Sequence, residues 1–150
     1  MKIVIQRVKK ASLLVEQKEK ANIQNGLLIL IGFEESETEE EMDWVANKIV
    51  NLRIFNNEEM KMNLSIKDLD GEILLVSQFT LFASIKKGNR PSFIKAASPI
   101  SAFNYYQRFV YALEKVFNKK IETGVFGADM EIRQVNNGPV TIIIDSKNIS

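Results

Sequence analysis

The chain has 150 residues, enough for one domain with its own core, and 45% of them are hydrophobic and 26% charged. Its 20 basic and 19 acidic residues leave a net charge of +1, and it has neither histidine nor cysteine. This composition excludes a disulfide framework, a Ser-His-Asp triad, a cysteine nucleophile and an ordinary zinc site. With no membrane-length apolar run and no signal-peptide pattern, we expect a single cytoplasmic domain over residues 1–150.

The charge is unevenly distributed along the chain. The segment from Glu34 to Asp43 contains seven acids and no base, which leaves 20 bases against 12 acids in the rest of the chain. This asymmetry permits a basic face that binds a polyanion. A solvated loop and helix start explains the acidic segment equally well.

The first half of the chain predicts three strands and a helix. The apolar-polar mixture of Ile3–Val8 is typical of a half-buried strand, and Leu13–Val15 follows as a second strand. Gly26–Gly32 is a continuous apolar run that suits a strand buried on both faces. Thr38, with a glutamate three residues later, forms a capping-box pattern, and apolar residues at helical spacing predict a helix over 38–51.

The second half repeats this mixture of strands and helices. Ile73–Val76 predicts a buried strand, residues 82–99 predict an irregular loop with two prolines, and Ala102–Val116 predicts an amphipathic helix. The C-terminal residues predict a strand, a turn and a second strand, at Glu131–Val135, 136–139 and Val140–Ile144. We therefore expect a mixed α/β domain with a largely antiparallel sheet or open β-barrel covered by two main helices.

Polar residues follow the predicted strand at 73–76. Ser77, Gln78 and Thr80 bring hydroxyls, an amide and consecutive backbone N–H groups to the end of a rigid element. Such groups could form an oxyanion hole. Turn and capping chemistry at a strand end explains the same residue types.

Two further segments could carry function. Gly138-Pro139 could contain a cis peptide bond and present its carbonyl groups in a fixed direction, although an ordinary trans turn is more common. Lys86, Lys87 and Arg90 lie in the predicted loop, near aromatic residues, where they could contact phosphates and stack a base. A solvated loop is the alternative interpretation.

With these segments taken together, the sequence resembles the bacterial D-aminoacyl-tRNA deacylase family. The resemblance runs from Gln6-Arg7-Val8 to Asp145, at the family's spacing and in a chain of the family's length. Its two defining motifs are Ser77-Gln78-Phe79-Thr80-Leu81 and Asn136-Asn137-Gly138-Pro139-Val140-Thr141. Further matching blocks are Gly26–Gly32, Asn51–Phe55, Lys61–Ser65, Gly88–Phe93 and Thr123–Met130.

The resemblance implies a homodimer with active sites at the subunit interface. Gly138-Pro139 of one subunit would be cis and would enter the site of the other subunit, leaving room for a D side chain and colliding with an L side chain. Arg7 matches the arginine that holds this turn in place, and Asn136 begins the motif. The substrate would be the 3′ end of D-aminoacyl-tRNA, and mischarged glycyl-tRNA would also be hydrolysed.

The resemblance also implies how the ester is cleaved. Backbone N–H groups around Phe79 and Thr80 would stabilise the oxyanion, while Ser77 and Gln78 shape the same pocket. Thr80 is not expected to be the nucleophile, since no histidine could activate it; instead the 2′-OH of the terminal adenosine would help to activate water. Phe126 and Met130 match the pocket for the terminal adenine, although core packing would also explain them. No metal or other cofactor is expected.

Two functions from other classes remain open at this point. A non-catalytic RNA-binding module would use the same basic loop and bind tRNA without turnover. A metabolic esterase on this scaffold would hydrolyse free aminoacyl esters as fast as charged tRNA.

Overall fold

Strand β1 (Lys2–Val15) organises the sheet, because three other strands pair with it in the computed structural model, which describes residues 1–149. The other strands of this sheet are β2 (Lys18–Ile23), β3 (Gly26–Gly32), β6 (Glu72–Ser77), β7 (Glu122–Thr123) and β8 (Met130–Asp145). The first half of β1 pairs antiparallel with β3, its second half pairs antiparallel with β2, and β8 runs antiparallel along its whole length. Beyond β3, the strands β6 and β7 continue the sheet in parallel.

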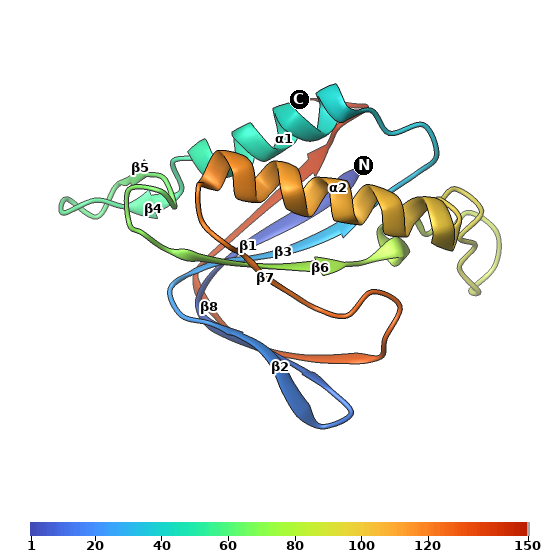
Figure 1. Ribbon diagram of the computed structural model, residues 1–150, viewed down its shortest axis with the longest axis horizontal. Helices are drawn as coiled ribbons and strands as arrows, with labels where there is room; N and C mark the ends of the chain where they lie inside the picture. Colours follow the sequence, from blue (N-terminus) through green and yellow to red (C-terminus); the bar gives the residue numbers. More distant parts are fainter. Residues whose placement is uncertain (150) are drawn as a thin grey trace.

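This arrangement confirms the expected mixed α/β fold with two main helices. The sheet is mixed and curls until it is nearly closed, with β2 and the first half of β8 below the level of β3 and β6 (Figure 1). Parallel pairing of β3 with β6 requires a crossover, and helix α1 lies in that crossover. The carboxyl ends of β3 and β6 therefore lie side by side.

Two of the expected boundaries are wrong. Ile3–Val8 and Leu13–Val15 belong to the single strand β1, because β8 pairs with this segment from end to end. The predicted turn at 136–139 does not separate two strands that pair with each other; both halves of β8 pair with β1. Between the pairs Gln6↔Thr141 and Val8↔Asn136 there is one residue in β1 but four in β8, so residues 137–140 bulge out of the ladder.

The two helices lie side by side on one face of the sheet (Figure 1). Helix α1 (Glu39–Asn51) begins as predicted, with the Thr38 side chain accepting a hydrogen bond from the Glu41 backbone N–H. Helix α2 (Pro99–Phe117) begins one turn earlier than its apolar pattern, because Ser98 accepts the capping bond from Ser101. Neither helix is long and apolar enough to cross a membrane, within the residues described.

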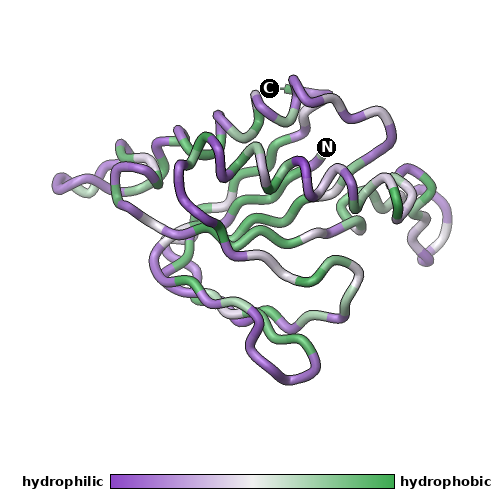
Figure 2. The backbone as a smooth tube through the Cα atoms, in the orientation of Figure 1, coloured by the Kyte–Doolittle hydropathy of each residue, from purple (hydrophilic) through white to green (hydrophobic). Residues whose placement is uncertain are grey.

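Two hydrophobic clusters stabilise the fold, because the central strands are covered on both faces. The larger cluster lies between the helices and the sheet, where Ile5 and Ile29 meet Ile49 and Phe109. The smaller one lies inside the curl of the sheet, and its members include Leu13, Leu28 and Val76. Figure 2 shows the resulting pattern, with hydrophobic residues concentrated along the central strands and hydrophilic ones on the outer loops.

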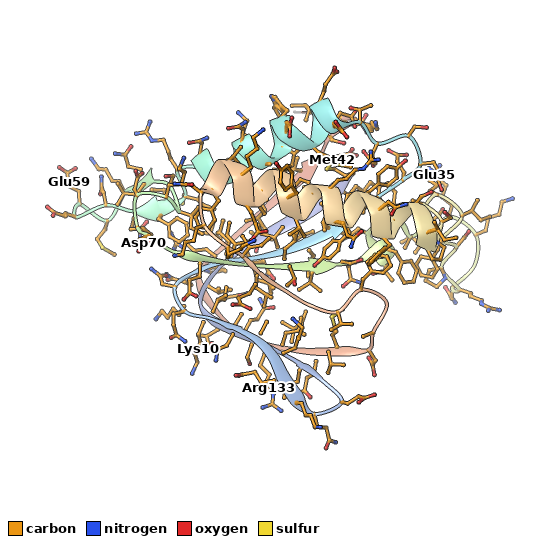
Figure 3. All side chains as sticks on the ribbon, in the orientation of Figure 1. Lys10, Glu35, Met42, Glu59, Asp70 and Arg133 are labelled. Carbon is orange, nitrogen blue, oxygen red and sulfur yellow. The ribbon has the colours of Figure 1, made fainter. Side chains whose placement is uncertain are left out.

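Several short elements have little apolar patterning and were not predicted. Strand β2 has only two buried residues, Ala21 and Ile23. Strands β4 (Phe55–Asn56) and β5 (Met62–Leu64) form a small hairpin, from which Glu59 projects away from the body of the molecule (Figure 3). The 3₁₀ helix η1 (Phe79–Phe82) follows β6 directly.

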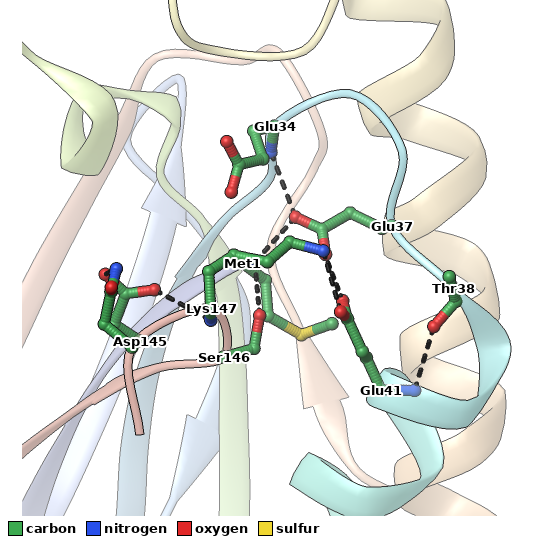
Figure 4. Close-up of polar contacts among 9 residues, drawn as sticks. Met1, Glu34, Glu37, Thr38, Glu41, Asp145, Ser146 and Lys147 are labelled. Carbon is green, nitrogen blue, oxygen red and sulfur yellow. Dashed lines mark hydrogen bonds and ion pairs between the residues drawn. The ribbon is translucent and has the colours of Figure 1, made fainter. Parts of the chain in front are cut away.

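A polar network joins the two ends of the described chain to helix α1 (Figure 4). The amino group of Met1 lies 2.6 Å from a Glu37 carboxylate oxygen and donates a 2.7 Å hydrogen bond to Ser146. Lys147 binds both carboxylate oxygens of Glu41, at 2.7 and 2.8 Å. These contacts fix the end of β8 beside the start of α1.

Candidate functional site

A cavity of about 670 Å³ opens where β3 and β6 end. Four segments far apart in the sequence enclose it: the end of β3, the end of β6, the loop from residue 93 into the start of α2, and the segment 126–132, which includes the first residues of β8. Most of its wall is apolar, and a few polar groups project into it, which is the usual composition of a site for an organic ligand.

The Ser-Gln-Phe-Thr segment forms one wall of this cavity. Ser77, the last residue of β6, lies next to Gln78 and Phe79, and all three line the cavity. Thr80 is exposed and is not among the lining residues; its hydroxyl accepts a hydrogen bond from the Gln78 side chain. The Gln78 backbone N–H donates to Ile31 at 2.7 Å, so the end of β6 is tied to β3.

The start of η1 leaves two backbone donors available beside the cavity. Phe79 and Thr80 are the first residues of η1, and the N–H groups of a first helical turn have no acceptor in a preceding turn. The side chain of Gln78 does not cap them; its amide nitrogen donates a hydrogen bond to the Thr80 hydroxyl. These N–H groups are therefore free to bind an oxygen atom of a ligand.

Phe126 and Met130 form the opposite wall of the cavity. The Phe126 ring lies 5.9 Å from the ring of Tyr106, a buried residue of α2. Tyr106 donates a 2.8 Å hydrogen bond to the Leu75 carbonyl, and burial raises the pKa of its hydroxyl, which keeps the group a donor. The aromatic wall is thus anchored to strand β6, which also carries Ser77.

Gly138-Pro139 lies outside the cavity of its own chain. The peptide bond between these residues is cis, as the resemblance implies, and both residues are exposed at the bulge of β8. Gly138 has a φ of +124°, and a Cβ at this position would lie 2.8 Å from the Arg7 guanidinium. Only glycine fits this conformation and this close approach.

Arg7 supports the bulge from the opposite strand. It is only 5% exposed, and its Nε donates a 3.0 Å hydrogen bond to the Asn137 carbonyl. Its Nη1 donates a 2.7 Å hydrogen bond to the Ile54 carbonyl, in the segment after α1. Asn136 has a different environment, since its side chain accepts a 2.6 Å hydrogen bond from Gln134 and does not contact Arg7.

The basic loop lies beside the cavity mouth. Lys86, Lys87 and Arg90 are exposed, and none of them lines the cavity. Phe93 of the same loop does line it, with its ring 5.1 Å from the ring of Phe79 in an edge-to-face arrangement. One loop therefore carries both an exposed group of positive charges and an aromatic residue of the cavity wall.

Asp129 was not singled out from the sequence. Among the lining residues of the described chain it is the one charged side chain. Its position directly before Met130 in a matching block could have drawn attention to it, but the sequence does not indicate that this residue lines a cavity. Within residues 1–149, no three histidine, cysteine or acidic side chains come together as metal ligands.

Comparisons with known proteins agree on one family. A family profile described as D-Tyr-tRNA(Tyr) deacylase matches residues 4–145. The D-aminoacyl-tRNA deacylases of Flavobacterium johnsoniae and Bacteroides thetaiotaomicron are 56% and 54% identical to this chain over 148 residues, which are 99% of each chain.

Two solved structures have the same fold. A protein named c-Myc DNA Unwinding Element Binding Protein is 39% identical, with a TM-score of 0.91 over 97% of this chain and 98% of that one. A probable eukaryotic D-amino acid tRNA deacylase is 18% identical, with a TM-score of 0.83 over 95% of this chain and 97% of that one. At that identity, the second likeness concerns the fold alone.

Proposed function

Because the chain belongs to the D-Tyr-tRNA(Tyr) deacylase family, we propose that it hydrolyses the ester bond of D-aminoacyl-tRNA and releases the free D-amino acid. The observation that carries this proposal is the cavity itself, which has the Ser77–Phe79 wall on one side and the Phe126–Met130 wall on the other. Mischarged glycyl-tRNA is a second substrate, since glycine has no side chain to exclude.

The backbone N–H groups of Phe79 and Thr80 stabilise the oxyanion that forms when water attacks the ester carbonyl. They lie at the start of η1 without a helical acceptor and next to the residues that line the cavity. Removing one such donor from an oxyanion hole typically lowers kcat about 100- to 1000-fold. Ser77 and Gln78 shape the pocket around the reacting carbonyl.

Activation of the water comes from the substrate. The chain has no histidine or cysteine, and the Thr80 hydroxyl is already engaged by Gln78 rather than by a base. The 2′-OH of the terminal adenosine is adjacent to the ester in the substrate, so it orients the water and can relay a proton, accepting one from the water while its own proton passes to the 3′-oxygen. Water adds to the carbonyl carbon, the bond to the ribose 3′-oxygen breaks, and that oxygen receives the proton.

Selection against L-amino acids comes from Gly138-Pro139 of a second subunit. In its own chain this motif is exposed outside the cavity, while Arg7 and the β1–β8 ladder hold it rigidly. A rigid, exposed motif is suited to insertion into a neighbouring subunit. Its carbonyl oxygens face the substrate Cα and leave no room for an L side chain, so an isologous homodimer contains two composite sites.

The RNA part of the substrate binds at the aromatic and basic side of the cavity. Phe126 and Met130 hold the terminal adenine by stacking and apolar contact. Lys86, Lys87 and Arg90 contact phosphates, in a stretch of sequence that has no acid between Glu72 and Glu114.

The test is deacylation of D-tyrosyl-tRNA and L-tyrosyl-tRNA side by side, with purified protein and a control without enzyme. We expect rapid release of D-tyrosine and a rate for the L ester equal to the control. Equal cleavage of both esters would contradict selection by Gly138-Pro139. Equally fast cleavage of a free D-tyrosine ester would support the metabolic esterase.

A nucleic-acid-binding module is the alternative, because the 39% identical relative is named for binding a DNA element and the basic loop suits any nucleic acid. In that case tRNA would bind without turnover, and the affinity would survive the loss of Gly138.

A further inference from the structure

An aromatic row leads from the core to the surface beside the cavity. Tyr106 is buried, and the Phe126 ring next to it lines the cavity. Phe103, one turn before Tyr106 on α2, also contacts Phe126, with its ring centre 5.3 Å away. The rings of Phe103 and Phe126 meet edge to face, at 69°. Phe103 itself is not among the residues that line the cavity.

Phe103 keeps a large part of its ring accessible. It is 42% exposed, and Ile100, three residues earlier on the same face of α2, is 78% exposed. Val125, directly before Phe126, is 39% exposed. Ile100 and Phe103 are therefore neighbouring exposed apolar side chains, and Phe103 connects this surface to the Phe126 wall, whereas single exposed apolar side chains are normally scattered.

The surroundings of this surface favour one kind of occupant. The loop that enters the cavity wall at Phe93 and continues into α2 carries exposed Lys86, Lys87 and Arg90, so a chain with negative charges is drawn to this part of the molecule. Unpaired nucleotides combine a charged backbone with flat apolar faces, and aromatic side chains stack on those faces whatever the base.

Resting on the proposed function, we propose that Phe103 is a second base-binding site, on which the nucleotide preceding the terminal adenosine stacks. With the adenine against Phe126 inside the cavity, the next base toward the 5′ end reaches the neighbouring ring. This contact lies outside the reacting ester, so it adds binding energy from a remote part of the substrate.

The experiment compares three substrates of increasing length: the D-tyrosyl esters of adenosine, of the dinucleotide CpA, and of tRNA. For Phe103→Leu we expect kcat/KM to fall about tenfold on the CpA and tRNA esters, because loss of one stacked base has effects of this order. On the adenosine ester, which has no second base, we expect a change smaller than about twofold.

Two matched variants complete the test. Phe103→Tyr keeps the ring and should keep the preference for CpA over adenosine. Tyr111→Leu changes another exposed aromatic residue of α2, 71% exposed, and should alter none of the three rates. If Phe103→Leu lowers kcat/KM equally on all three substrates, Phe103 only supports Phe126. If it lowers kcat/KM on none of them, no base stacks on Phe103. Either result overturns the inference.

Binding measurements separate this inference from the proposed reaction. Calorimetry with non-hydrolysable 3′-amide analogues of the adenosine and CpA esters makes the same comparison without turnover. If the native protein cleaves no ester, the proposed function fails. The inference about Phe103 still stands or falls on whether Phe103→Leu weakens the CpA analogue selectively.

Discussion

Arg7 makes two hydrogen bonds from a buried position, and both reach backbone carbonyls far away in the sequence. It joins the Asn137 carbonyl of the β8 bulge to the Ile54 carbonyl after α1. A buried carbonyl that loses such a partner costs about 1–3 kcal/mol. Arg7 therefore determines both the stability of this region and the position of Gly138-Pro139.

For Arg7→Met we expect a free energy of unfolding lower by about 3 kcal/mol, because two charge-assisted hydrogen bonds are lost and the apolar volume is kept. The ratio of D-tyrosyl-tRNA to L-tyrosyl-tRNA cleavage should fall as well. Urea denaturation gives the first quantity and parallel deacylation assays give the second. A variant of native stability with full discrimination would refute the assigned role.

Asp129 is the one charged residue among those that line the cavity in the described chain, and an aminoacyl ester carries an ammonium group that a carboxylate could bind. We expect Asp129→Asn to lower kcat/KM for D-tyrosyl-tRNA about tenfold, as for the loss of one charge-assisted contact. The matched substrate is tRNA carrying the corresponding D-2-hydroxy acid, which has a hydroxyl in place of the ammonium. Its rate should be unchanged; an equal loss on both would show that Asp129 acts on the shape of the cavity instead.

At the scale of elements, the close approach of β3 to β6 positions the end of β6 at the cavity. Gly26 permits this approach, because a Cβ on it would lie 1.8 Å from the Glu72 carbonyl oxygen. The parallel pairing then runs from Gly26 opposite Glu72 to Ile31 opposite Ser77. The register set at one end of the two strands therefore decides where Ser77 lies at the other end.

For Gly26→Ala we expect a loss of about 3 kcal/mol in the free energy of unfolding, since two backbones must move apart. Activity should fall together with stability, even at temperatures where the variant is fully folded. Gly88→Ala is the control: its Cβ would meet no atom within 4 Å, and only its φ of +64° opposes the change. Thermal unfolding with circular dichroism, followed by deacylation assays, checks both. Native activity of folded Gly26→Ala would contradict this account.

At the scale of the whole molecule, one face of the sheet near Gly138-Pro139 lacks a cover. Ile143 of β8 is 74% exposed, and its partner across the ladder, Val4, lies at the same face. A homodimer in which Gly138-Pro139 reaches the other subunit would bury this face. Selective catalysis would then depend on dimer formation, because each cavity is completed by Gly138-Pro139 of the other subunit.

We therefore expect the native protein to have about twice the monomer mass of 17.1 kDa in solution, as an isologous dimer does. Ile143→Lys should shift it towards the monomer and reduce D-specific deacylation, although Ile143 does not line the cavity. Light scattering after gel filtration measures the mass. A monomeric variant with unchanged rate and selectivity would exclude the composite site.

The network between α1 and the end of β8 gives the stability a defined pH dependence. Burial by itself would raise the pKa of Glu41, but the hydrogen bonds and the charge of Lys147 have a larger effect. The pKa of Glu41 therefore lies below its ordinary value. The same contacts raise the pKa of Lys147. A carboxyl with a lowered folded pKa stabilises the protein above its unfolded pKa, and this stabilisation is lost as the pH falls through the folded pKa. Glu37 has the opposite effect on the pH dependence of stability, because burial raises its pKa above the ordinary value.

For Lys147→Met we expect a stability loss of about 1 kcal/mol at pH 7, as for a partly exposed ion pair. The difference from the native protein should shrink as the pH falls below the ordinary pKa of Glu41 and disappear once Glu41 is protonated. Thermal unfolding at a series of pH values between 7 and 3 measures it. A difference that stays constant across this range would show that Lys147 acts by packing alone.

Local patterns in the sequence were sufficient to predict the two helices and the buried strands. Helix α1 begins at its predicted cap because capping and apolar spacing are local properties. Ser77, Gln78, Phe126 and Met130 could be named for the same pocket only through the family resemblance. The apolar periodicity of the sequence does not indicate that Ser77 and Phe126, which are 49 residues apart, line the same cavity.

Only the tertiary structure decided how the strands continue and where the motif lies. Residues 136–139 have the composition of a turn, yet they bulge from one strand because β1 pairs with β8 on both sides of them. The Arg7 side chain reaches the Asn137 carbonyl of this bulge from the paired strand, and Asp129 is one of the residues that line the cavity. Pairing, close approach and the environment of a charge depend on residues distant in the sequence, and local propensity does not encode them.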